Sequence, residues 1–93
     1  MRKRSEILEE ESIACDKIWY DRHQWIMQNE YPKEKDPGVI RCMKGGIRAA
    51  KKLEKKYGKK NLQPYTDYEW GLLRGRLETL RWVLGFDWGN FDT

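Results

Sequence analysis

The chain has 93 residues, which allows one small domain with a single core. Charged residues make up 37% of it, and five tryptophans and five tyrosines supply large apolar groups for that core. No apolar run approaches the ~20 residues that a membrane-spanning helix needs, and the start MRKRSEILEEES lacks the apolar core of a signal peptide. The net charge of +4 argues against an acidic mimic of DNA. We therefore expect a cytoplasmic protein of one domain, residues 1–93, without membrane contact.

The chain holds two cysteines, too few for the disulfide framework of a small secreted protein. Cys15 and Cys42 also match no zinc or redox spacing. We expect both to be buried thiols rather than partners in a disulfide.

A first helix is predicted over residues 6–30. Ser5 is a candidate N-cap, and acidic residues in the first turns, among them Glu6 and Glu9, suit the positive end of the helix dipole. Two prolines and a charge cluster in YPKEKDPG, residues 31–38, end the helix. Apolar residues at helical spacing predict its buried face: Leu8, Cys15, Ile18, Trp19, Trp25 and Ile26.

The single histidine, His23, lies on this helix near two other polar side chains. Asp16 and Tyr20 precede it at helical intervals, so the three could share one face and carry acid–base chemistry. Such a set more often forms a hydrogen-bonded structural cluster, and we predict no catalytic residue. Because no second histidine is present, we also predict no metal site and no cofactor.

A second helix is predicted over residues 38–57. Asp36 and Pro37 fit the cap and the first helical position, and Gly58 fits the residue that ends a helix. Gly45 and Gly46 inside the helix predict either a kink or the close approach of a neighbouring helix. The buried face is predicted to hold Ile40, Met43, Ile47, Ala50, Leu53 and Tyr57.

Basic residues crowd the same segment, where Glu54 is the one acid between residues 44 and 60. Such a run indicates either a solvated helix face or contact with a polyanion. No helix-turn-helix spacing is present, so recognition of a duplex in a fixed register is not expected. If the run contacts a polyanion, the contacts would come from Lys51, Lys52, Lys55, Lys56 and Lys59, with Arg74 and Arg81 of the following helix.

A third helix is predicted over residues 67–84. Thr66 and Glu69 are spaced as a capping box, and Gly85 fits the end of the helix. Its core stripe is predicted to be Trp70, Leu73, Leu77, Leu80 and Leu84.

A second line of small and aromatic residues runs beside that stripe: Tyr68, Gly71, Gly75, Thr79 and Trp82. Each glycine costs a helix interior roughly 0.5–1 kcal/mol relative to alanine, so a close contact is expected there. Three explanations stay open: packing within the chain, contact between two copies, and a groove for a flat ligand.

The tail FDWGNFDT, residues 86–93, carries Phe86, Trp88 and Phe91 between acidic residues. We expect the tail to fold back and bury these rings, or to act as a docking peptide that anchors in a partner protein.

No segment alternates as a β-strand does. The sequence predicts an all-α fold, a three-helix bundle with the aromatic tail packed on it. Because a chain of this size has a thin margin of stability, self-association into a homo-oligomer is also expected.

Two segments resemble a family of small phage, prophage and mobile-element proteins: EWGLLRGRLETLRWVLGFDWGNFDT, residues 69–93, and KIWYDRH, residues 17–23. The resemblance assigns no catalytic or binding residue. It implies an accessory protein of a mobile element, and proteins of this size and setting often antagonise host defence.

We therefore predict a non-enzymatic binding protein that inhibits a bacterial antiviral defence system in the host cytoplasm. Its partner would be a defence protein, or the nucleic acid or nucleotide messenger that such a protein uses. The alternative is a nucleic-acid-binding regulator that uses the basic second helix.

Overall fold

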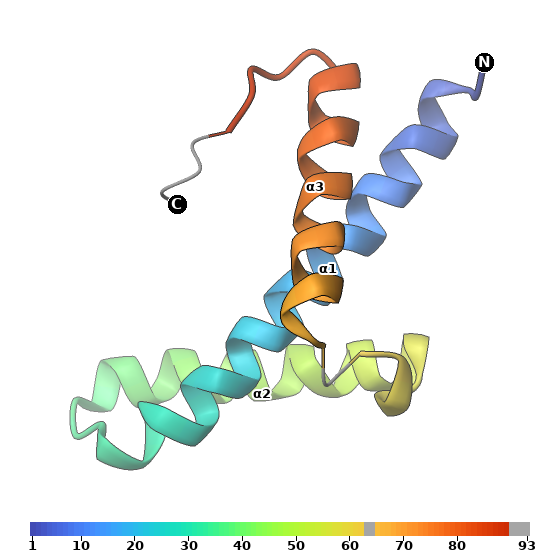
Figure 1. The fold of residues 1–93 in the computed structure, drawn as a ribbon. Coiled ribbons are helices and arrows are strands. Elements are labelled where there is room, and N and C mark those ends of the chain that lie inside the picture. Colours follow the sequence, from blue (N-terminus) through green and yellow to red (C-terminus); the bar gives the residue numbers. More distant parts are fainter. Residues whose placement is uncertain (63–64, 90–93) are drawn as a thin grey trace. The chain divides into compact units, whose positions relative to one another are not determined.

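The computed structural model describes residues 1–62 and 65–89, and no β-strand occurs among them (Figure 1). The prediction of an all-α fold with three helices is confirmed, with helix bounds within two residues of those expected. The elements, in chain order, are α1 Arg4–Asn29, the 3₁₀-helix η1 Tyr31–Lys33, α2 Pro37–Tyr57, the 3₁₀-helix η2 Lys59–Asn61 and α3 Asp67–Val83.

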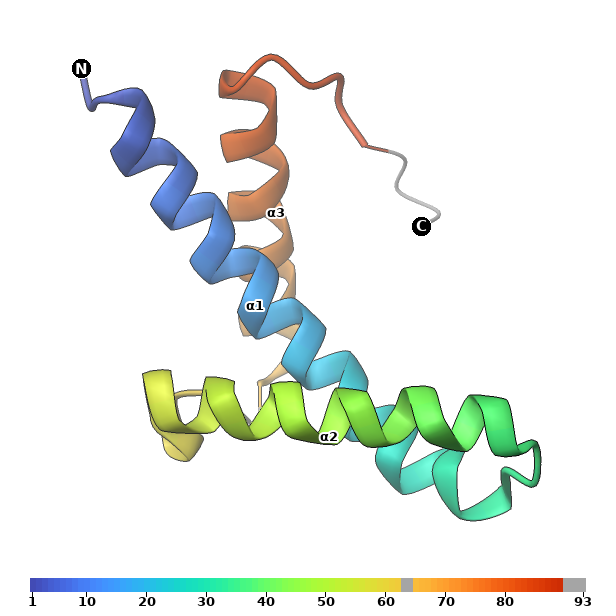
Figure 2. The same cartoon turned by 180° about the vertical axis from the view of Figure 1, so that it is seen from behind.

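The chain divides into two compact units, and α1 contributes to both. The first unit joins residues 1–18 to the segment that begins at residue 65 and contains α3. The second unit spans residues 19–64 and contains the rest of α1 with α2 (Figure 2). Each unit has a small core of its own.

Helix α1 begins before its predicted cap, because it starts at Arg4 and includes Ser5. The backbone N–H groups of Glu6 and Ile7 donate to the Lys3 carbonyl, and the Lys3 N–H donates to Glu6 Oε1 at 3.3 Å. Glu6 therefore reaches back to Lys3 as the third residue of a helix does in a capping box. The prediction of Ser5 as the cap is wrong.

The starts of α2 and α3 match their predictions. Asp36 Oδ1 accepts from the N–H groups of Gly38 and Val39 at 2.8 and 3.4 Å. The Glu69 N–H donates to Thr66 Oγ1 at 3.1 Å, and the Thr66 N–H donates to Glu69 Oε1 at 3.0 Å, which completes the capping box. Hydrogen bonds from the Thr66 backbone and then from its side chain lower the pKa of Glu69, since they favour the charged form of the carboxylate.

Helix α3 ends in a Schellman motif. The Phe86 N–H donates to the Arg81 carbonyl and the Gly85 N–H to the Trp82 carbonyl. Gly85 has a φ of 106°, a conformation that side chains rarely adopt, which explains why glycine follows the C-cap Leu84.

The core of the first unit brings the N-terminal half of α1 against α3. Ala14, Leu73 and Leu77 are buried together, and Cys15, Ile18 and Tyr65 pack around them. At the edge of this core Arg81 Nε donates to Glu11 Oε1 at 3.1 Å.

The core of the second unit brings the C-terminal half of α1 against α2 and residue 62. Tyr20, Ala50 and Leu62 are buried, with Leu53 and Tyr57 packed against them. The Tyr20 hydroxyl donates to Glu54 Oε2. Burial and the adjacent Glu54 carboxylate raise the pKa of Tyr20 to about 12.

Several residues of α1 that were expected in the core lie at the surface instead. Leu8, Trp19 and Trp25 are exposed. Because α1 packs against α3 in its first half and against α2 in its second, it buries different positions in each half, and no continuous stripe is covered. The expectation of a buried Cys42 is also wrong, since this thiol is exposed on α2, whereas Cys15 is partly buried.

Among the described residues, no helix combines the length and the apolar character that crossing a membrane requires.

Candidate functional site

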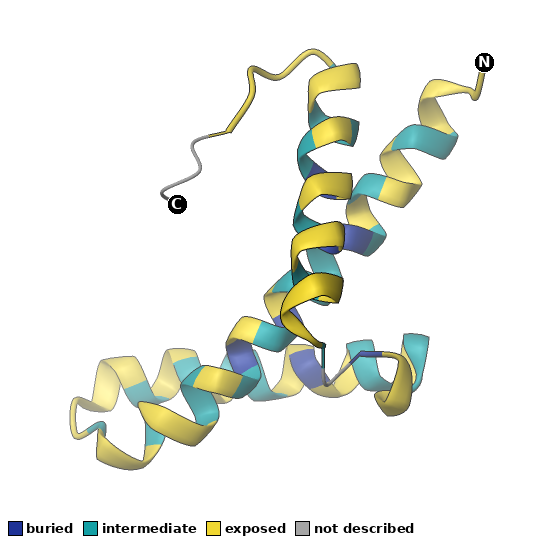
Figure 3. Ribbon diagram, viewed as in Figure 1, coloured by how far each residue is buried: buried dark blue, intermediate teal, exposed yellow. Residues whose placement is uncertain are grey.

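Helix α2 presents cations along the side opposite its buried residues. Intervals of three and four place them on one helical face, which extends over about 22 Å at ~1.5 Å per residue. All seven are exposed. Exposed and less exposed stretches alternate along α2 in Figure 3, as expected for a helix with one side in water. We call this set the basic face: Arg41, Lys44, Arg48, Lys51, Lys52, Lys55 and Lys56.

No acid of α2 neutralises the basic face. Glu54 is the one acidic residue of the helix, and its carboxylate accepts the hydrogen bond from the buried Tyr20. Within the described part of the chain, no side chain of the basic face forms an ion pair. Lys56 Nζ lies 5.2 Å from the centroid of the Tyr57 ring, a contact that leaves its charge in place. The basic face therefore keeps its positive charge for a partner.

The predicted anion-binding residues fall into two groups. Lys51, Lys52, Lys55 and Lys56 belong to the basic face, and Lys59 follows it, exposed, in η2. Arg74 and Arg81 belong to α3 in the other unit, and the Arg81 guanidinium is paired with Glu11.

Three cations of the basic face were missing from the predicted contact set. Arg41, Lys44 and Arg48 continue the same spacing toward the start of α2, past Gly45 and Gly46. The signal that could have found them is the helical periodicity of charge, rather than the local density of lysines.

Gly46 allows a close contact between α2 and α1. A Cβ at this position would lie 3.0 Å from Cε1 of His23, so a larger residue would displace the ring. The His23 ring also stacks on Trp19, with centroids 4.9 Å apart. Burial lowers the pKa of His23, although the Glu54 carboxylate acts in the opposite direction.

Two of the three polar residues of α1 singled out in the sequence contact other partners. The Tyr20 hydroxyl donates to Glu54, and the His23 ring stacks on Trp19. Asp16 belongs to the first unit. Among the described residues, no group of three His, Cys, Asp or Glu side chains is placed to hold a metal ion.

The two glycines of α3 have no close neighbour. A Cβ built at Gly71 or Gly75 would meet nothing within 4 Å. Tyr68 and Trp82 lie at the two ends of the predicted line of small and aromatic residues, and they are 76% and 52% exposed. Packing within the described chain therefore does not explain these glycines, and the other two explanations remain.

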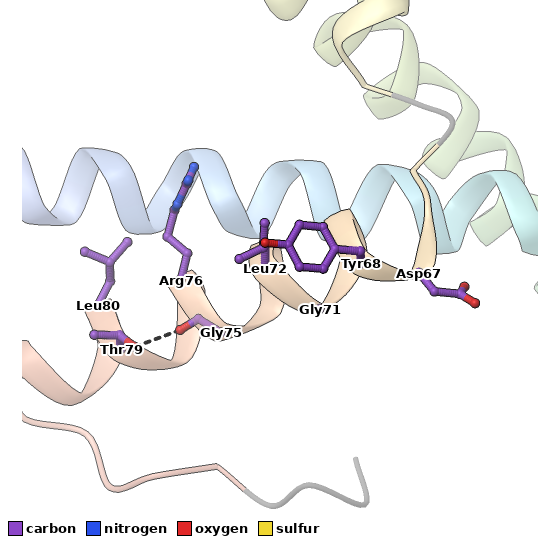
Figure 4. Close-up of a pocket in the computed structure, with 8 residues that line it drawn as sticks. All are labelled: Asp67, Tyr68, Gly71, Leu72, Gly75, Arg76, Thr79 and Leu80. Atoms are coloured by element: carbon purple, nitrogen blue, oxygen red, sulfur yellow. Dashed lines mark hydrogen bonds between the residues drawn. The ribbon is translucent and has the colours of Figure 1, made fainter.

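Two hollows lie over the glycines of α3, and both are lined by Gly71, Gly75 and Thr79. One hollow, of about 680 Å³, also has Tyr68 and Leu72 in its lining (Figure 4). The other, of about 740 Å³, lies between α3 and the tail. Thr79 Oγ1 donates to the Gly75 carbonyl at 2.8 Å, so this hydroxyl is already satisfied within the helix.

The described part of the tail runs back along α3. Trp88 stacks on Trp82 with centroids 5.3 Å apart, and the Gly89 N–H donates to Glu78 Oε2 at 2.7 Å. Phe86 and Trp88 nevertheless stay exposed, so the expectation of buried rings is wrong for these two. Phe91 lies outside the described residues.

Comparisons of the chain with protein-family models, curated proteins and solved structures give no match. The resemblance to mobile-element proteins thus stays a prediction, and function is inferred from the surfaces described above.

Proposed function

We propose that the protein is a non-enzymatic binding protein whose basic face contacts the phosphates of a nucleic acid. The observation that carries this proposal is the row of seven exposed cations along α2, with the only acid of the helix turned to the core. Of the two functions predicted from the sequence, this observation favours the nucleic-acid-binding regulator.

The composition of the basic face favours contact that does not depend on base sequence. Five of its seven residues are lysines, which act as flexible point charges on phosphates. Base edges are read most specifically by planar side chains that form two hydrogen bonds at once, such as those of Asn, Gln and Arg. Only Arg41 and Arg48 of the basic face are of this kind. We expect affinity that varies little among base sequences and strongly with salt.

Fluorescence anisotropy with labelled single-stranded and duplex oligonucleotides tests the proposal. The variant Lys52→Glu/Lys55→Glu reverses two charges of the basic face and should weaken binding at least about tenfold, because each reversal removes one phosphate contact and adds repulsion. The matched control is Lys33→Glu/Lys35→Glu, which makes the same change in net charge at two exposed residues outside α2.

The control variant should retain binding close to that of the unmodified chain. Equal losses in the two variants would show that only net charge matters and would contradict the assignment to α2. No measurable binding by the unmodified chain at low salt would contradict the proposal itself.

A second candidate function is the predicted inhibitor of a bacterial defence system, and the exposed tail rings favour it. Phe86 and Trp88 are large aromatic groups at the surface, of the kind that anchor protein interfaces. In bacteria that carry a defence system, expression of the chain would then restore phage plating, and Phe86→Ser/Trp88→Ser would not. Restoration by both forms, or by neither, would count against docking through the tail.

A further inference from the structure

The described part of the tail, residues 86–89, meets the outer side of α3 at two successive turns. The Trp88 ring stacks on Trp82, with the two ring planes 11° apart. The next residue, Gly89, donates its N–H to Glu78 Oε2 at 2.7 Å, one turn earlier in the helix. We call these two contacts, Trp88 with Trp82 and Gly89 with Glu78, the latch.

The backbone of Gly89 lies against the Glu78 carboxylate in a space that has no room for a side chain. A Cβ at this position would lie 2.8 Å from Cδ of Glu78, so the carboxylate would have to leave its bond to the N–H. The φ of Gly89 is not positive, so the path of the backbone does not require glycine here. The glycine therefore serves the contact with Glu78.

The packing around the latch is open. Glu78 and Gly89 line two hollows, of about 740 and 460 Å³. Phe86 and Trp88 are 64% and 60% exposed although the tail is closed on α3. Closing the tail therefore buries little apolar surface, and the hydrophobic effect adds little to the stability of the latch.

The latch is weak because its contacts are offset by the entropy of ordering the tail. A hydrogen bond and a ring stack each contribute modestly to stability in water. Fixing the backbone of residues 86–89 opposes them by an amount of the same order. We therefore expect the closed and the open tail to have comparable populations.

We propose that the latch is an autoinhibitory contact: the closed tail withholds Trp88 from a partner protein, and the open tail presents it. A tryptophan that anchors an interface is enclosed by a pocket of the partner. In the closed tail one face of the Trp88 ring is already covered by Trp82, so insertion into a pocket and closure of the latch exclude each other. The partner that fits is a protein with an apolar pocket for an indole ring.

The latch would set the affinity of the tail without touching the partner. The apparent affinity of a site falls in proportion to the fraction of chains that are competent to bind. Gly89→Ala leaves Phe86 and Trp88 in place but opens the latch, so it should raise the affinity roughly two- to tenfold. This role rests on the second candidate function, docking through the tail, whereas the latch itself does not.

Solution NMR of the full chain tests the latch. The Gly89 amide should exchange with water more slowly than in an unstructured peptide, but by less than about tenfold, because the tail opens often. Trp82→Ala should restore the unstructured rate at Gly89, although the hydrogen bond of Gly89 is to Glu78. Glu78→Ala should in turn shift the indole N–H signal of Trp88, although that ring stacks on Trp82.

Tyr68→Ala is the matched control for Trp82→Ala, because it removes another exposed ring of α3, one that lines neither hollow beside the latch. It should leave the signals of Gly89 and Trp88 unchanged. Glu78→Gln retains an acceptor and should keep most of the protection at Gly89. Unprotected Gly89 in the unmodified chain, or independent responses of the two contacts, would overturn the latch. Protection above about a hundredfold would show that the tail does not open.

Phage plating in bacteria that carry a defence system tests the autoinhibitory role separately. Gly89→Ala should restore plating at roughly two- to tenfold lower expression than the unmodified chain. Weaker restoration by Gly89→Ala would overturn the autoinhibitory role. If neither form restored plating while the NMR result was as expected, the second candidate function and the role that rests on it would fail, and the latch would stand.

Discussion

Helices α2 and α3 each bury one apolar side, but they present opposite chemistry on the other. The outer side of α2 is the basic face, whose charges are well solvated without a partner. The outer side of α3 carries aromatic and aliphatic groups that remain exposed: Tyr68, Leu72, Trp82 and Val83. The difference shows that the outer side of α2 suits contact with water, whereas the outer side of α3 leaves apolar groups exposed in the described chain.

The largest expected effect on the free energy of unfolding comes from comparing two adjacent leucines that lie on opposite sides of α3. Leu73→Ala should reduce the free energy of unfolding by about 2–5 kcal/mol, because it leaves a cavity between α1 and α3 in the first unit. Leu72→Ala removes the same atoms from the exposed side of α3 and should change the free energy of unfolding by less than about 0.5 kcal/mol.

Chemical denaturation at low protein concentration measures both changes. Comparable losses in the two variants would mean that Leu72 is buried within the monomer, and the distinction between the two sides of α3 would fail.

A smaller effect on the free energy of unfolding follows from the protonation of His23, which lies in the second unit. Because burial lowers the pKa of His23 in the folded chain, the unfolded chain binds more protons just below the ordinary pKa of ~6.5. The contribution of His23 to the free energy of unfolding should therefore be constant above that pH. It should then fall as the pH decreases through 6.5 toward the folded-state pKa.

Urea denaturation at a series of pH values, with His23→Gln as the reference, isolates this contribution. The chain has a single histidine, so the difference between the two pH profiles reports the His23 proton. A difference that stays flat, or in which the unmodified chain gains stability relative to His23→Gln as the pH decreases below 6.5, would show that the ring is not held in its neutral form.

The helix boundaries could be predicted because local chemistry determines them. Asp36 with Pro37, Thr66 with Glu69, and Gly85 each satisfy or end a helix through neighbours within a few residues. The prediction for Ser5 is wrong, because Glu6 bonds to the Lys3 N–H and the helix begins at Arg4. The sequence offers both Ser5 and Lys3 with Glu6 as local starts, and spacing alone does not choose between them.

The core of α1 could not be predicted from periodicity alone. A single apolar stripe assumes one partner along the whole helix, but α1 has one partner in each half. Trp19 and Trp25 consequently lie at the surface although their spacing suggested burial. The role of Glu54 was hidden for a related reason, since its partner Tyr20 is distant in the sequence.

The candidate surfaces were predicted in part. The lysines from 51 to 56 follow directly from the sequence. Arg41, Lys44 and Arg48 lie outside that dense run, although the predicted helix already contains them. The glycines of α3 were recognised as unusual, yet only the absence of neighbours in the structure separates a contact within the chain from one outside it.

The most direct test of the basic face is the salt dependence of nucleic-acid binding. If six or seven of its cations contact phosphates, the logarithm of the binding constant for a single strand should fall linearly with the logarithm of salt concentration, with a slope of about −4 to −5. Lys52→Glu/Lys55→Glu should make the slope less steep by at least one. Binding that persists with a slope near zero would show that aromatic docking, rather than the cations of α2, holds the partner.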